Sequence, residues 1–199
     1  MQDRKNKVIV TPARSGSSWL VSSFARNGYN AYPVSLSETQ KGEEIFDLHD
    51  RIDNLYTYTP FVTKVFCDEL IDLTLLQKYK NSTDFIWLYR NNRVEHFLSN
   101  IIAWQTGVFT VLPGETYVTP EHVEFPDYQM WQYEAMMIHE QVTYNRYKHL
   151  FTFEIAYEDL IDNNPWGFKP DDDLPVKGNV YSPELLEQAE NKLKEWNLI

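Results

Sequence analysis

The alternation of apolar and polar segments along the chain predicts a series of strand–helix units. Four short apolar runs have the length and the β-branched or aromatic content of buried strands: residues 7–11, 61–66, 84–89 and 150–155. Three segments that follow the first three runs repeat apolar residues at helical spacing: residues 17–25, 69–79 and 94–104. Strands that alternate with helices form parallel sheets with right-handed crossovers and helices on both faces. The pattern therefore predicts an α/β layer fold.

The C-terminal segment is predicted to be a capped helix. Ser182 is a residue type that caps helices, and Pro183 is suited to the first helical position. The apolar side chains that follow form one stripe: Leu185, Leu186, Ala189, Leu193 and Trp196. In contrast, residues 106–127 contain three prolines and two glycines without a clear period. Such a segment is typical of a long ordered loop that covers a functional site.

Length and composition limit the class of protein. A chain of 199 residues, 43% of them hydrophobic, supports one buried core, so residues 1–199 are predicted to form a single domain. No stretch has the apolar length needed to cross a bilayer, and the polar N-terminal residues lack the apolar core of a secretory signal. Cys67, the lone cysteine, cannot form an internal disulfide. We therefore expect a cytoplasmic protein without a membrane partner.

The net charge restricts the ligands. A formal charge of −11 repels nucleic acids and polyanionic glycans, so neither is an expected partner. A locally basic cleft can still hold a small anion. The net charge therefore does not exclude small phosphorylated ligands.

A turn of small residues between the first strand and the first helix is the best candidate for an anion site. It contains Arg14, Ser15 and Gly16 and runs into Ser17 and Ser18. Backbone N–H groups at a helix N-terminus lack intrahelical partners and attract anions, while glycine allows a close approach. The loop is not a standard Walker A sequence, because Thr11 or Pro12 replaces its first glycine and Ser17 replaces its lysine.

Two further segments lie at predicted strand ends. Arg90 directly follows the third strand, and Ser99 lies nine positions later on the next helix. Tyr157 begins the sequence Tyr-Glu-Asp-Leu, which closes the fourth strand. Because ligands of open α/β sheets bind at the carboxyl ends of the strands, these residues are expected at one edge of the sheet.

In this order, the three segments resemble the sulfotransferases that use 3'-phosphoadenosine 5'-phosphosulfate (PAPS). The Arg90–Ser99 spacing and residues 103–107 look like the bacterial branch similar to trehalose sulfotransferase. The resemblance implies a P-loop-like three-layer fold with a central parallel sheet flanked by helices. It also implies the PAPS-binding residues: Arg14, Ser15, Gly16, Ser17, Ser18, Trp19, Arg90, Ser99 and Tyr157. The loop would bind the 5'-phosphosulfate, Arg90 and Ser99 the 3'-phosphate, and Tyr157 would face the adenine.

The implied reaction moves the sulfuryl group from PAPS to a hydroxyl of a small acceptor, such as a carbohydrate, and releases adenosine 3',5'-bisphosphate. It uses no metal. Arg14 would neutralise the leaving phosphate, and Lys64, at the position of a family lysine, would follow the bridging oxygen. The chain departs from the family at the general base, because Phe66 replaces one family base, a histidine, and Ser35 replaces the other, a glutamate. Glu38 is the nearest acid and becomes the candidate base.

Several alternatives stay open at this point. The function can instead be that of a P-loop kinase or NTPase, or of a nucleotide-binding module without turnover. The loop can be a serine-rich helix cap beside a surface arginine, and Lys64 can be a lysine that protects an edge strand. Arg93 can replace Arg90, or both can be surface charges. The sequence leaves the acceptor and the oligomeric state undetermined, although aromatic residues could form a sugar-binding wall: Trp104, Phe109, Tyr117, Trp131 and Tyr133.

Overall fold

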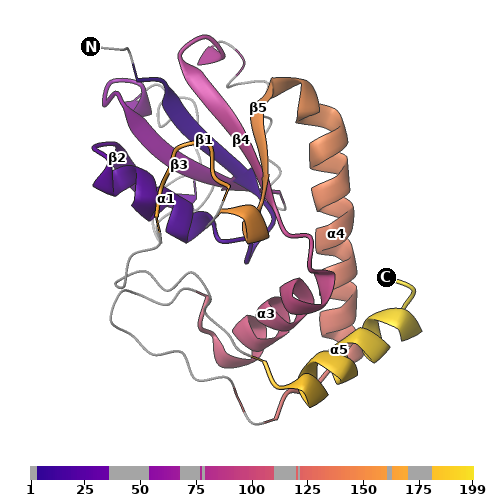
Figure 1. Cartoon of the computed structure of the whole chain (residues 1–199). Coiled ribbons are helices and arrows are strands. Elements are labelled where there is room, and N and C mark those ends of the chain that lie inside the picture. The colour runs from indigo at the N-terminus through magenta and orange to yellow at the C-terminus, as the bar shows by residue number, and fades with distance from the viewer. Residues whose placement is uncertain are drawn as a thin grey trace, which may run out of the picture.

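A computed structural model describes residues 4–35, 54–67, 77, 79–109, 120, 122–160, 163–169 and 181–199. Its centre is a five-stranded sheet in the order β2-β3-β1-β4-β5, and every pair of neighbours is parallel (Figure 1). The strands are β1 (Asn6–Thr11), β2 (Asn30–Ser35), β3 (Phe61–Phe66), β4 (Thr83–Tyr89) and β5 (Phe151–Ala156). The predicted α/β fold with a central parallel sheet is confirmed.

Helices cover this sheet and extend beyond it. They are α1 (Ser17–Arg26), α3 (Arg93–Thr106), α4 (Asp127–Tyr147) and α5 (Pro183–Glu195). Two short 3-10 turns, η4 (Lys148–Leu150) and η5 (Tyr157–Asp159), flank β5. Most of the helix predicted at residues 69–79 lies outside the described residues. In the described part of the chain, no helix is both long and apolar enough to span a bilayer.

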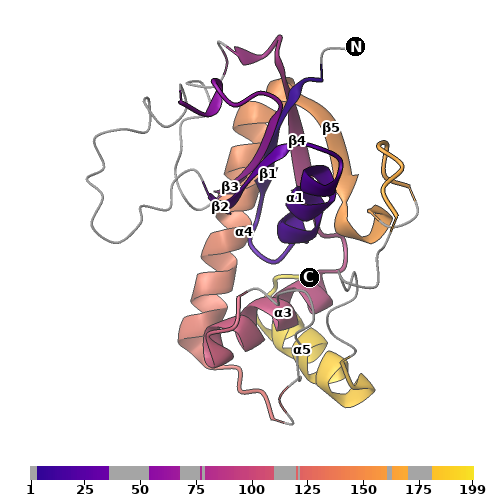
Figure 2. The same cartoon turned by 90° about the vertical axis from the view of Figure 1, so that its left-hand side faces the viewer.

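The three central strands of the sheet, β1, β3 and β4, are buried on both faces. Successive side chains of a strand point to opposite faces. Val8 and Val10 therefore pack with Tyr147 at the end of α4, whereas Ile9 packs with Phe24 of α1. Figure 2 shows α1 and α4 on opposite sides of the strands. This arrangement gives three layers, with the sheet in the middle.

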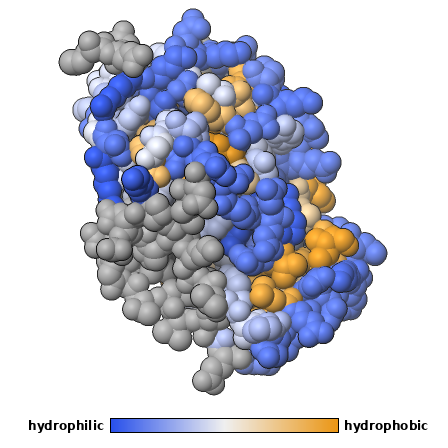
Figure 3. Space-filling view, viewed as in Figure 1, coloured by the Kyte–Doolittle hydropathy of each residue, from blue (hydrophilic) through white to orange (hydrophobic). Residues whose placement is uncertain are grey.

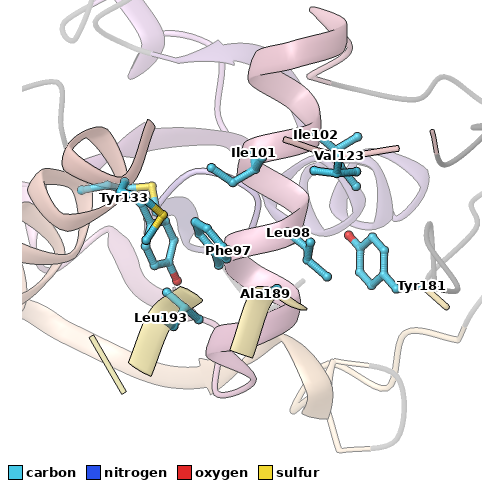
Figure 4. Packing of buried hydrophobic residues seen from close by; sticks show 11 residues of the cluster. Phe97, Leu98, Ile101, Ile102, Val123, Tyr133, Tyr181, Ala189 and Leu193 are labelled. Carbon is cyan, nitrogen blue, oxygen red and sulfur yellow. The ribbon is translucent and has the colours of Figure 1, made fainter. Parts of the chain in front are cut away.

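A further apolar cluster lies where α3, α4 and α5 meet (Figure 4). Phe97 of α3 packs against Tyr133 of α4 with ring centroids 5.0 Å apart. Leu193 of α5 is fully buried in the same cluster. The cap of α5 is as predicted, since the Ser182 side chain accepts a hydrogen bond from the Leu185 amide and proline occupies the first turn. This cluster holds α3 in place beside the sheet.

The sequence did not predict β2 and α4. β2 contains Pro33, which argues against a central strand but is compatible with the edge position that β2 occupies. α4 lacks a single apolar face, because Met130 and Tyr133 are buried while Trp131 and Ile138 are exposed. Two opposite apolar faces cancel the periodic signal on which helix prediction depends.

Candidate anion-binding site

The loop between β1 and α1 lies at the point where the strand order reverses. β1 is the middle strand, with β3 on one side and β4 on the other. The chain runs from β1 through α1 to β2 and β3 on one side of β1, and it then crosses from β3 to β4 on the other side. In open parallel sheets such a point leaves a crevice at the carboxyl ends of the strands, where ligands bind. Residues 12–16 occupy this position.

The N-terminus of α1 is suited to a negative charge. Its first helical hydrogen bond runs from the Leu20 amide to the Gly16 carbonyl at 3.2 Å, so the amides of Ser17 and Ser18 precede the helical ladder. Among the described residues, no side chain caps this end, and the first turn contains no acid. The first turns of the other described helices, α3, α4 and α5, each contain a carboxylate. Within the described part of the chain, no acidic side chain in the first turn compensates the positive end of the α1 dipole.

Gly16 is required by its close contact with Tyr157. It adopts φ 80°, in the left-handed region, and a Cβ at this position would lie 2.3 Å from the Tyr157 ring. The ring itself packs 4.7 Å from the Arg90 guanidinium carbon. Burial is the largest influence on the Tyr157 hydroxyl and raises its pKa, although Arg90 opposes the shift. Gly16, Tyr157 and Arg90 therefore form one continuous contact.

Arg14 connects the loop to α3. Its Nε donates to Ser99 Oγ at 2.9 Å, and its guanidinium also donates to the Phe109 carbonyl. The backbone of Arg14 has φ 62°, an uncommon conformation for a residue with a side chain. The alternative of a serine cap with a surface arginine is wrong, since the N-cap is Gly16 and Arg14 is partly buried in contact with α3.

Arg90 is a buried cation between two carboxylates. It is 8% exposed, its Nη2 donates to Glu95 at 2.9 Å, and its Nε lies 4.0 Å from a Glu158 oxygen. The surface-charge interpretation is therefore wrong for Arg90. Arg93 has a different partner, because both of its terminal nitrogens donate to the Glu140 carboxylate of α4, at 2.6 and 2.9 Å.

Lys64 lies inside the sheet. β3 stands between β2 and β1, so the interpretation of Lys64 as an edge-strand lysine is wrong. Its side chain is 8% exposed, with Nζ 3.5 Å from Ser18 Oγ. Ser35, at the end of β2, is the register partner of Lys64 in β3. Phe66, the last residue of β3, lies two positions after Lys64. Glu38, the candidate base, lies outside the described residues.

The remaining loop residues differ in what they offer a ligand. The Ser15 side chain is fully buried, and its Oγ has no hydrogen-bond partner among the described residues. An unsatisfied buried hydroxyl is costly, so a ligand oxygen in reach would stabilise it. The Trp19 side chain instead packs in the core with Leu20 and Phe24. Trp19 can therefore contact a ligand only through its backbone amide.

His96 is a structural part of the site that sequence reasoning missed. Its Nε2 lies 2.7 Å from the Ala13 carbonyl and therefore carries the proton, while Nδ1 lies 3.3 Å from the Tyr133 hydroxyl. Burial is the main reason that the pKa of His96 falls to about 3, and the nearby charges of Arg93, Arg90 and Arg14 lower it further. The imidazole is neutral and ties the loop to α3. In the sequence, the one indication of this role was that His96 lies within the predicted helix of residues 94–104, on the side that is buried.

The structure separates the aromatic residues that the sequence grouped as a wall. Tyr133 is buried in the α3–α4–α5 cluster, whereas Trp131 lies on the outer face of α4 and is 60% exposed. Tyr117 lies outside the described residues. Among the described side chains, no three His, Cys, Asp or Glu lie close enough together to hold a metal ion.

Comparison of the sequence with models of known protein families and with curated proteins finds no match.

Proposed function

We propose that this protein is a PAPS-dependent sulfotransferase that acts on a hydroxyl of a small acceptor. The observation that carries the proposal is the convergence of segments far apart in the sequence. The β1–α1 loop contacts Ser99 through Arg14 and Tyr157 through Gly16, and Tyr157 contacts Arg90. A basic site at a helix N-terminus within a protein of charge −11 indicates a small anionic ligand.

In the proposed complex, the 5'-phosphosulfate of PAPS lies on the α1 N-terminus. The amides of residues 17–19, the Ser15 hydroxyl and the Arg14 guanidinium donate to its oxygens. Arg14 must then exchange the Ser99 hydroxyl and the Phe109 carbonyl for phosphate oxygens. Ser99 becomes available to the 3'-phosphate, together with Arg90. The 3'-phosphate competes with Glu95 for the Arg90 guanidinium.

The proposed transfer places charge where the site has cations. The acceptor oxygen forms a bond to sulfur while the bond from sulfur to the 5'-phosphate oxygen breaks, and the electron pair leaves with the phosphate. Arg14 and the α1 dipole stabilise this departing charge. Lys64 lies close to the same helix end, with its Nζ 3.5 Å from Ser18 Oγ. The acceptor proton passes to a base, for which Glu38 is the candidate. Phe66 and Ser35, at the two family positions, cannot take this proton.

The acceptor and the setting are parts of the same proposal. A small hydroxyl compound, such as a carbohydrate, suits an acidic protein better than a polyanionic glycan does. Cys67 is the one cysteine of the sequence and is buried, which is compatible with a reducing compartment such as the cytoplasm.

The test compares two nucleotides that differ in the 3'-phosphate. We expect adenosine 3',5'-bisphosphate to bind without metal and more tightly than AMP. Arg90→Ala should weaken the bisphosphate about ten- to a hundredfold, the value of one or two charge-assisted hydrogen bonds, and leave AMP nearly unchanged. Glu95→Gln should tighten the bisphosphate severalfold, because it removes a competing carboxylate. Isothermal titration of each variant, with folding checked by circular dichroism, gives these constants.

Other outcomes would favour the alternatives. Equal losses for both nucleotides in Arg90→Ala would remove Arg90 from the 3'-phosphate site. Tighter binding of ATP with magnesium than of the bisphosphate would indicate a kinase or NTPase. Bisphosphate binding without sulfate transfer to a broad panel of hydroxyl compounds would indicate a binding module without turnover.

A further inference from the structure

The outer face of α4 carries an apolar stripe that the described residues do not cover. Tyr128, Trp131, Ile138 and Val142 are each 55–60% exposed, and Ala135 between them is also exposed. These five residues, here called the outer stripe, are spaced alternately by three and four positions. That spacing is the a/d repeat of helices that pair as coiled coils. Single exposed apolar residues are ordinary, but a repeat along one helix marks an interface.

The outer stripe is distinct from the face that α4 uses to build the fold. Met130, Tyr133 and Met136 point into the core, and at about 3.6 residues per turn they lie opposite the outer stripe. Trp131 contacts Trp196, at the end of α5, with ring centroids 6.3 Å apart. Figure 3 shows hydrophobic residues at the surface in the region where α4 and the end of α5 meet. Apart from this contact of Trp131, the stripe lies outside the described core, and its exposed side chains are available to a partner.

We propose that the outer stripe pairs with the same stripe of a second copy, antiparallel and related by a two-fold axis. In this register Trp131 faces Val142 of the second copy, and Ala135 faces Ile138 of the second copy. Large side chains thus oppose smaller ones. A parallel pair would place Trp131 against itself and Ala135 against itself, which packs less evenly. Self-complementary faces of this kind are the usual basis of two-fold dimers.

Charges beside the stripe match the antiparallel register. Asp127 at the start of α4 is 70% exposed, with Lys192 at 4.0 Å, and Lys148 directly follows the helix and is exposed. In the antiparallel pair Asp127 faces Lys148 of the second copy, twice by symmetry. A parallel pair would place Asp127 beside Gln132 instead. The two helix dipoles also run in opposite directions in the antiparallel pair, so the positive end of one helix lies beside the negative end of the other.

The size of the contact sets the expected strength. The 21 residues of α4 form a helix about 31 Å long and about 10 Å wide, which covers roughly 300 Å². Stable interfaces bury about 800 Å² per partner. We therefore expect a reversible dimer whose population rises with protein concentration. This proposal does not depend on the proposed function.

The test is sedimentation velocity of the full chain over a wide range of concentration. Wild type should pass reversibly from monomer to dimer. Ile138→Glu should raise the dissociation constant at least a hundredfold, because symmetry buries the charge twice. Gln188→Glu is the matched control, since it adds the same charge at an exposed position of α5 and should leave association unchanged.

The register has its own test. Lys148→Glu should weaken the dimer severalfold through repulsion from Asp127 of the second copy, and Asp127→Lys with Lys148→Glu should restore it. A wild type that stays monomeric at every concentration, or a dimer that is indifferent to Ile138→Glu, overturns the proposal. A double exchange that fails to restore association overturns the antiparallel register. A monomer that Ile138→Glu destabilises toward urea would show that the chain itself covers the stripe.

Discussion

Replacing Gly16 by alanine tests the contact between the anion-binding loop and Tyr157. The new methyl carbon would lie 2.3 Å from one Tyr157 ring carbon and 2.6 Å from another, well inside the contact distance of about 3.5–4 Å. The ring must therefore move by more than about 1 Å and lose its packing on Arg90. Overpacking of this kind costs about 1–3 kcal/mol, and a left-handed alanine costs about 1 kcal/mol more. We expect Gly16→Ala to lower the free energy of unfolding by roughly 2–4 kcal/mol.

The matched control is Gly107→Ala. Gly107 also lies at a helix end with φ 71°, but a Cβ there would meet nothing within 4 Å. It should therefore show the backbone cost of about 1 kcal/mol alone. The gain from a less flexible unfolded chain is common to both substitutions and cancels. Urea unfolding followed by circular dichroism measures the difference between the two variants.

A double-mutant cycle with Tyr157→Ala then separates the steric cost. Once the ring is absent, Gly16→Ala should cost no more than Gly107→Ala, so the two changes at the site should be strongly non-additive. Equal costs of Gly16→Ala and Gly107→Ala in the wild-type background would refute the reasoning. Additive losses in the cycle would refute it equally.

The pH dependence of stability should contain a contribution from His96. The folded protein keeps His96 neutral down to about pH 3, whereas the unfolded chain protonates it near 6.5, so the unfolded state binds the extra proton between these values. The free energy of unfolding should fall by about 1.4 kcal/mol per unit below pH 6.5, and His96→Gln should lack this part of the slope. Identical slopes in both proteins would contradict the assignment. At the other end of the chain, Ser182→Ala should cost about 1 kcal/mol in urea unfolding, since it removes the cap on the Leu185 amide. A negligible cost would mean that α5 is held by packing alone.

The sequence by itself determined the elements whose pattern is local. β3 begins and ends at the predicted residues, and β1, β4, β5 and α1 differ from their predicted bounds by a residue or so. These segments bury continuous apolar runs or one apolar face, so their periodicity is visible without the fold. The cap and stripe of α5 were equally local, and so was the loop between β1 and α1.

Only the tertiary structure decided which side chains meet. No spacing in the sequence relates Arg14 to Ser99, Gly16 to Tyr157 or Lys64 to Ser18, because these contacts depend on the strand order. The strand order also made Lys64 an interior residue. Burial of His96 and the pairing of Arg93 with Glu140 required α4, whose two apolar faces hide it from periodicity. Local patterns follow from neighbours along the chain, whereas the site is made by residues that only the assembled sheet and its helices bring together.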